Sequence, residues 1–358
     1  MSRYKYGAFI TPIAAEGESE HDAVQGFFKD CDVAYEKGYD SIWMTEHHFT
    51  SYHPVPDPFA MLSHLAARCP GIGLGTGVLV TPWHHPLRLA GQIAALSNIT
   101  DAPIYIGMGR GNAVKEYEAF GVDQNYAREQ FGEIWKILQL AMTGEPFTFE
   151  GEQHSVAREV AIHPKPRMDN VIFYGAVGQP SSASLIGEQG LALMTNPMQP
   201  ETLREIVQNW TAAAEGKIDT RTPRVIAPWT VIADTDEEAE ELAMRFIGEQ
   251  MKAAKFHYEM DVKKKIRGFE YMSEDRYQSV FKPDEATVRG FMRGCLVGTA
   301  ASVAEQWQAL LDIGFDHLLV NVSVPNASRE LRRGWLRRFV DDVVPLMERE
   351  PQLASGVA

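Results

Sequence analysis

Few cysteines and no long apolar run limit where this chain can work. Its three cysteines, Cys31, Cys69 and Cys295, lie far apart and lack the CxxC spacing of metal and redox motifs. An odd number of cysteines without such a motif favours a reducing compartment. No stretch approaches the about 18 apolar residues of a membrane helix, and the first residues form no apolar signal region. We therefore expect a cytoplasmic protein that does not span a membrane.

Basic charge is also scarce. The formal net charge of the 358 residues is −14, which disfavours nucleic-acid binding because phosphate neutralisation needs a clustered basic surface. The one dense basic run, residues 263–267, lies in a segment of mixed composition and is interpreted as a solvated face. We expect no nucleic-acid partner.

Strand-like and helix-like segments alternate along the whole chain. Eight strand candidates are each followed by a helical pattern, and this order predicts parallel pairing in a closed (β/α)8 TIM barrel. The candidates are residues 4–10, 41–46, 72–80, 104–108, 171–176, 191–195, 225–232 and 317–322. We expect one barrel domain over residues 1–358.

Two stretches do not fit a strand–helix unit. Residues 147–166 are interpreted as an irregular excursion. Residues 255–293 are longer than an ordinary connection and mix charged, aromatic and glycine residues. Because they would follow the seventh strand, we expect them to form a mobile lid on the active-site face of the barrel.

Ionisable residues stand at the end of the second predicted strand. Residues 41–44 are a short, mainly apolar run, and Glu46, His47 and His48 follow it. Successive strand residues point to opposite faces, so the two histidines do not enter one pocket together while the strand persists. This disfavours a metal site, and we expect no metal ligands. A single histidine suits proton transfer, and the alternative is that both only hydrogen-bond at the strand end.

Two glycine-containing loops favour an anionic ligand. Arg110 lies in the Gly-Met-Gly-Arg-Gly-Asn stretch after the fourth strand, and arginine binds phosphate through a forked pair of hydrogen bonds. Ser181 and Ser182 lie where the loop after the fifth strand enters a helix, whose N-terminal N–H groups attract anions. An ordinary serine N-cap is the alternative. Together these residues predict a phosphomonoester clamp.

Several strings carry a resemblance over nearly the whole chain. In order, they are Glu-His-His-Phe at 46–49, Leu-Gly-Thr-Gly-Val at 74–78, Gly-Arg-Gly at 109–111, Phe-Gly at 120–121, Val-Gly-Thr at 297–299 and Gly-Phe-Asp-His-Leu-Leu at 314–319. In these strings and their order the chain resembles the bacterial luciferase-like flavin-dependent monooxygenase family. The resemblance implies a luciferase-like TIM barrel that binds reduced FMN.

The resemblance also implies where the flavin ring lies. His47 takes the place of the family's catalytic histidine beside the isoalloxazine. Gly77 and Val78 fall where luciferase has a non-prolyl cis peptide under the ring. The segment around 255–290 falls where luciferase has a mobile lid.

The flavin phosphate is placed in the same way. Arg110, Ser181 and Ser182 fall where the family holds the phosphate, and the backbone of Gly178 and Gln179 lies beside them.

Departures from luciferase limit what the resemblance implies. Gly109 replaces the reactive cysteine that precedes the arginine, and luciferase lacks the Gln179-Pro180 pair. Light emission and a long-chain aldehyde substrate are therefore not expected. We expect a non-luminescent enzyme that oxygenates another small organic compound.

The implied reaction needs a second protein. A separate NAD(P)H:flavin reductase supplies FMNH2, which reacts with O2, and the peroxyflavin transfers one oxygen atom to the substrate. The alternatives are a deazaflavin-dependent oxidoreductase on the same fold, a non-catalytic flavin-binding protein and a metal-dependent barrel hydrolase. A homodimer is also implied, for which the candidate contact residues, with core packing as their alternative role, are Leu62, Leu65, Leu89 and Ile93.

Overall fold

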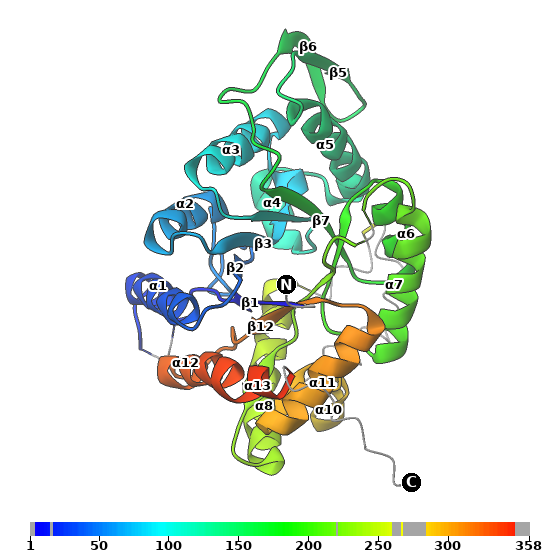
Figure 1. The fold of residues 1–358 in the computed structure, drawn as a ribbon. Coiled ribbons are helices and arrows are strands. Elements are labelled where there is room, and N and C mark those ends of the chain that lie inside the picture. The colour runs from blue at the N-terminus through cyan, green and yellow to red at the C-terminus, as the bar shows by residue number, and fades with distance from the viewer. Residues whose placement is uncertain (1–3, 15–16, 220, 260–265, 268–283, 348–358) are drawn as a thin grey trace.

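Eight parallel strands close into a barrel, as the sequence predicts (Figure 1). This computed structural model describes residues 4–14, 17–219, 221–259, 266–267 and 284–347. Around the barrel the strands are β1 (Lys5–Phe9), β12 (His317–Asn321), β9 (Val225–Ile226), β8 (Ala192–Thr195), β7 (Val171–Val177), β4 (Ile104–Gly109), β3 (Gly73–Val80) and β2 (Ser41–Met44). Because all the strands run in one direction, their carboxyl ends meet at one mouth.

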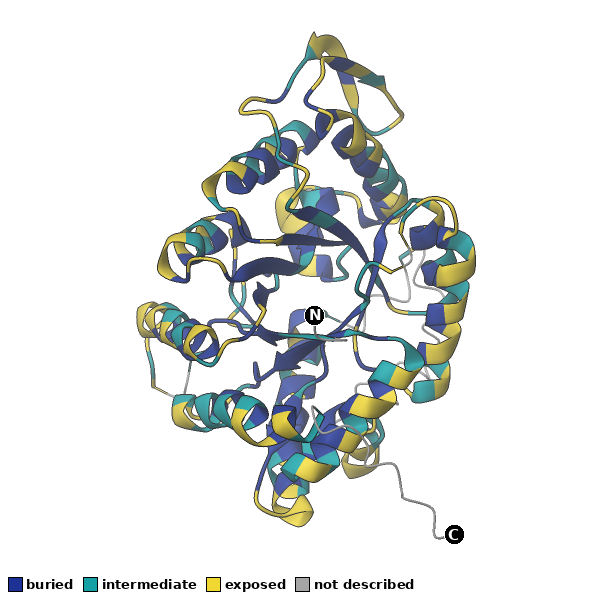
Figure 2. Ribbon diagram, in the orientation of Figure 1, coloured by how far each residue is buried: buried dark blue, intermediate teal, exposed yellow. Residues whose placement is uncertain are grey.

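Helices surround the strands and bury their apolar faces against them (Figure 2). In α1, for example, Ser19 caps the first turn through the backbone N–H of Asp22, and Phe27, Cys31 and Ala34 are buried. The described helices are α1 (Glu20–Glu36), α2 (Pro58–Arg68), α3 (Pro86–Ile99), α4 (Val114–Phe120), α5 (Ala127–Ala141), α6 (Pro180–Glu188), α7 (Pro200–Ala214), α8 (Asp236–His257), α10 (Glu285–Met292), α11 (Ala300–Ile313), α12 (Arg329–Arg338) and α13 (Val344–Met347). None of them is long and apolar enough to cross a bilayer.

Large side chains fill the interior of the barrel. Trp43 and Tyr105 are stacked with ring centroids 5.0 Å apart, and Tyr174 and His317 pack against them. A Cβ on Gly75 would lie 2.2 Å from the Trp43 ring, so the indole fits only beside a glycine. Because side chains fill the interior in this way, a ligand of the barrel has space at the mouth and not inside it.

Two predictions about the strands are wrong. Residues 147–166 are not irregular, since β5 (Phe147–Glu150) and β6 (Ser155–Val160) form an antiparallel hairpin. Residues 225–232 are not one strand: β9 ends at Ile226, and β10 (Thr230–Ile232) pairs outside the barrel with β11 (Leu296–Gly298). Pro228 lies between them and has no N–H to donate to a strand partner, which explains the break.

The predicted lid falls mostly outside the described residues. Of residues 255–293, the first three end α8, and the last ten include α10. The predicted dimer contacts are fully buried within the chain, because Leu62, Leu65, Leu89 and Ile93 have no exposed surface. Their alternative role, core packing between α2 and α3, is the one the structure shows.

Candidate active site

A cavity of about 290 Å³ opens at the carboxyl ends of the barrel strands. It is lined by five residues that the sequence singles out: His47 after β2, Gly77 and Val78 on β3, Arg110 after β4 and Gly178 after β7. Four barrel strands therefore bring these five residues together at the mouth of the barrel.

The remaining candidates of the phosphate clamp do not line this cavity. Gln179, Ser181 and Ser182 lie at the start of α6, directly after Gly178. Ser181 is exposed, and the backbone N–H of Ser182 donates to the carbonyl of Gln179 at 3.0 Å. The clamp therefore stays a prediction, with Arg110 and Gly178 in the cavity lining and the two serines outside it.

The backbone of β3 forms part of the cavity wall. The peptide bond between Gly77 and Val78 is cis, as the resemblance implies. The carbonyl of Val78 accepts the backbone N–H of Glu46 at 3.1 Å. This hydrogen bond joins the residue before His47 to the cavity wall, and it therefore fixes the position of the His47 backbone.

Glu46 and His48 hold the end of β2 in place, and Glu46 also lines the cavity. The carboxylate of Glu46 is buried, accepts the backbone N–H of Val80 at 2.8 Å and lies 3.0 Å from ring nitrogens of His48 and His84. Burial alone would raise the pKa of Glu46, but hydrogen bonds with both histidines outweigh it and lower that pKa. The ring of His48 packs on Phe120, so it is His47 that lines the cavity.

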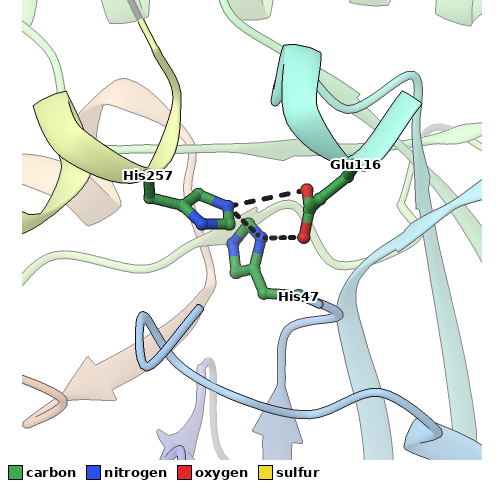
Figure 3. A group of neighbouring side chains, drawn as sticks. All are labelled: His47, Glu116 and His257. Atoms are coloured by element: carbon green, nitrogen blue, oxygen red, sulfur yellow. Dashed lines mark hydrogen bonds and ion pairs between the residues drawn. The ribbon is translucent and has the colours of Figure 1, made fainter. Parts of the chain in front are cut away.

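His47 contacts two residues from distant parts of the chain (Figure 3). Its Nδ1 lies 3.0 Å from Nε2 of His257, at the end of α8, and 3.6 Å from Oε1 of Glu116, on α4. Nε2 of His257 lies 3.5 Å from Oε2 of the same carboxylate. All three side chains are buried.

Burial and hydrogen bonding set the charges in this cluster. Burial lowers the pKa of His47, and the nearby carboxylate of Glu116 opposes that shift only in part. Burial would raise the pKa of Glu116, but the two histidine rings beside it outweigh burial and lower that pKa to about 2. At neutral pH the cluster therefore contains a carboxylate and an uncharged His47.

A second polar chain lines the same cavity. Gln250 on α8 donates from Nε2 to Tyr52 at 2.9 Å and bonds Nε2 of His53 at 2.8 Å, while Thr11 bonds Nδ1 of His53 at 2.6 Å. Burial lowers the pKa of His53 to about 3, so this wall is polar and uncharged at neutral pH.

Sequence reasoning missed Glu116 and His257. Glu116 lies on the seven-residue α4, whose apolar pattern is too short to predict a helix. His257 is the last residue of α8 and falls in the segment predicted to be a lid. The prediction of no metal ligands considered only adjacent histidines. It did not consider the grouping of His47, Glu116 and His257, whose donor atoms lie within 4.8 Å of one another.

The sequence profile described as luciferase-like monooxygenase matches residues 13–317. The chain belongs to the luciferase-like monooxygenase family. Membership makes it a flavin-dependent monooxygenase, and this sets aside a non-catalytic flavin-binding protein and a barrel hydrolase.

Similar proteins agree with this assignment. The oxygenase component of flavin-dependent trigonelline monooxygenase from Acinetobacter baylyi is 23% identical over 321 residues, covering 88% of this chain and 87% of the relative. Among solved structures, the oxygenating constituent of 3,6-diketocamphane monooxygenase from Pseudomonas putida, in complex with FMN, has a TM-score of 0.74 at 20% identity, covering 96% of this chain and 98% of that one.

A different cofactor occurs on the same fold. An F420-dependent secondary alcohol dehydrogenase, in complex with an F420–acetone adduct, has a TM-score of 0.74 at 18% identity, covering 97% of this chain and 100% of that one. At these identities the likeness to solved structures shows the barrel and does not separate FMN from the deazaflavin F420.

Proposed function

We propose that this luciferase-like monooxygenase is the oxygenase component of a two-component system, which uses FMNH2 and O2 to oxygenate a small organic substrate. The main support is the cavity at the barrel mouth, where His47, the Gly77–Val78 backbone, Arg110 and Gly178 converge. Sites at the carboxyl ends of barrel strands are where enzymes of this architecture work.

The residues of the cavity fit a flavin mononucleotide. Phe9, Val78 and Met194 offer an apolar bed for a flat ring. Arg110 offers a cationic group for a phosphate beside Gly178, where added side-chain atoms would meet nothing within 4 Å. The side-chain amides of Asn196 and Asn321, which also line the cavity, suit the polar edge of a ring or substrate.

The bound reduced flavin would supply the activation of O2, and the protein supplies orientation and a proton. His47 is uncharged at neutral pH and offers one ring hydrogen, which we assign to hydrogen bonding with the reacting oxygen or the substrate. The carboxylate of Glu116 accepts a hydrogen bond from the backbone N–H of His48, with 2.5 Å between N and Oε1. This bond fixes the loop that carries His47.

A reductase partner follows from the need for reduced flavin. The relative from Acinetobacter baylyi is called an oxygenase component, which supports the same division of labour here. We also propose a homodimer, formed through surfaces other than the four buried residues of α2 and α3.

Reconstitution tests this function. The purified protein is combined with a flavin reductase, NAD(P)H, FMN and a panel of small organic compounds under 18O2. We expect one labelled oxygen atom in a product and a dependence on FMN. Oxidation or reduction of substrates with F420, and none with FMN, would assign the protein to the deazaflavin alternative.

A further inference from the structure

Two ring nitrogens face each other at the centre of the site. Nδ1 of His47 and Nε2 of His257 are 3.0 Å apart, so one nitrogen donates and the other accepts. We infer that His257 is the donor and that, with Glu116, it is a positioning residue that keeps the ring hydrogen of His47 on Nε2. This inference rests on the proposed function only for its effect on turnover.

The carboxylate of Glu116 decides which nitrogen carries the hydrogen. Its Oε1 already accepts the backbone N–H of His48 at 2.5 Å. Its Oε2 is buried without a full hydrogen bond among the described residues and lies 3.5 Å from Nε2 of His257. A hydrogen on Nε2 of His257 serves both that oxygen and Nδ1 of His47, whereas a hydrogen on His47 would leave Oε2 without a donor.

The ring of His257 is held in the orientation this requires. Its Nδ1 lies 2.6 Å from the hydroxyl of Thr50, which can donate to it or accept from it. The ring of Tyr52 stacks on it, with centroids 4.7 Å apart and an interplanar angle of 20°. His257 itself is 1% exposed, so water does not compete for Nε2.

The hydrogen bond from His257 determines which ring nitrogen of His47 carries its hydrogen. With Nδ1 occupied as an acceptor, the hydrogen of uncharged His47 is on Nε2. That nitrogen lies 3.3 Å from the hydroxyl of Tyr258, which also lines the cavity. His47 therefore meets a bound ligand as a hydrogen donor, whereas the other tautomer would meet it as an acceptor.

The same three side chains also form a donor set that a zinc ion accepts. A metal would require that both facing nitrogens lack hydrogens. The shared hydrogen and a bound metal are thus mutually exclusive, and one experiment separates them.

The test uses the full chain labelled with 15N-histidine, with the His47 signals assigned by their loss in His47→Ala. In the wild type near pH 7.5 we expect the signature of an uncharged ring with hydrogen on Nε2. A hydrogen on Nδ1 of His47 would overturn the inference. So would a stoichiometric metal ion that is lost in His257→Leu. These readouts do not depend on oxygenation, so they stand even if the proposed function fails.

Matched substitutions extend the test to turnover. His257→Gln keeps an N–H donor at about the same reach and should retain the His47 tautomer and most of kcat. His257→Leu removes the donor and should lower kcat about tenfold or more, raise peroxide release and leave KM nearly unchanged. Equal loss of kcat in both variants, with the wild-type tautomer retained, would contradict the positioning role. Thermal unfolding of both variants checks that each is folded.

Discussion

Arg110 supplies a positive charge at the barrel mouth in the proposed flavin site. We predict that Arg110→Gln weakens FMN binding about 10- to 100-fold, since a hydrogen bond to a charged group contributes roughly 1.5–3 kcal/mol. Riboflavin, which lacks the phosphate, should bind wild type and variant equally. Flavin fluorescence titration measures both ligands.

A substitution outside the site controls for net charge. Arg158 on the exposed β6 strand carries the same charge, and Arg158→Gln should leave FMN affinity unchanged. Equal weakening of FMN and riboflavin in Arg110→Gln would show that Arg110 holds the fold of the site and not the phosphate.

His47 is the second residue on which the proposed chemistry depends. Because the proposed phosphate contact is Arg110 and not His47, His47→Ala should still bind FMN. Product formed per NAD(P)H oxidised should fall by about 100-fold or more, the range for loss of a hydrogen-bond donor to the reacting atoms, with peroxide released instead. Unchanged coupling between NAD(P)H and product would remove His47 from the mechanism.

Among the elements, β4 packs closely on β3. A Cβ added at Gly107 would lie 2.1 Å from the backbone oxygen of Thr76, so Gly107→Ala should destabilise the barrel by roughly 1–3 kcal/mol. The matched control is Gly91→Ala on α3, where the Cβ meets nothing within 4 Å; there we expect stabilisation of up to about 1 kcal/mol. Urea unfolding compares the two, and similar stabilities would contradict this packing.

The sequence predicted most of the barrel because apolar runs after turn residues are a local signal. All eight barrel strands lie within or beside their expected ranges. Strand β3 and the segments after β2, β4 and β7 place five candidate residues in the cavity. Pro228 carried a signal that was not used, since a proline inside residues 225–232 argues against one continuous strand.

The contacts around His47 were not predictable from local patterns. Glu116 and His257 reach it from helices 69 and 210 residues further along the chain, and only the closed barrel brings them together. The dimer residues were proposed because the family resemblance implies a dimer through the helices near the second and third strands, but apolar residues on those helices also suit a helix face packed on a core. Burial settles which role they serve.

Buried histidines give the whole molecule a pH-dependent stability. Burial lowers the pKa of both His53 and His317 to about 3, against about 6.5 when unfolded. Between these values the unfolded chain binds protons that the folded chain does not, so stability is full above about pH 6.5 and is lost as the pH falls. Each histidine contributes a slope of about 1.4 kcal/mol per pH unit in this window.

The contribution of His317 to this pH-dependent stability can be measured by itself. It is buried in the barrel interior beside Ser41 and outside the cavity lining, so His317→Gln removes one titrating group without touching the site. Unfolding free energies measured from pH 7 to pH 4 should fall less steeply in this variant than in the wild type. Parallel curves would show that His317 is protonated to the same extent in both states.

A crystal structure of the enzyme soaked with FMN under anaerobic conditions tests the assignment most directly. We predict an isoalloxazine ring against the Gly77–Val78 peptide, with its phosphate within hydrogen-bond distance of Arg110 and its reactive edge facing His47. Flavin density elsewhere on the molecule, or a barrel mouth left empty at saturating FMN, would contradict the proposed site and the reaction built on it.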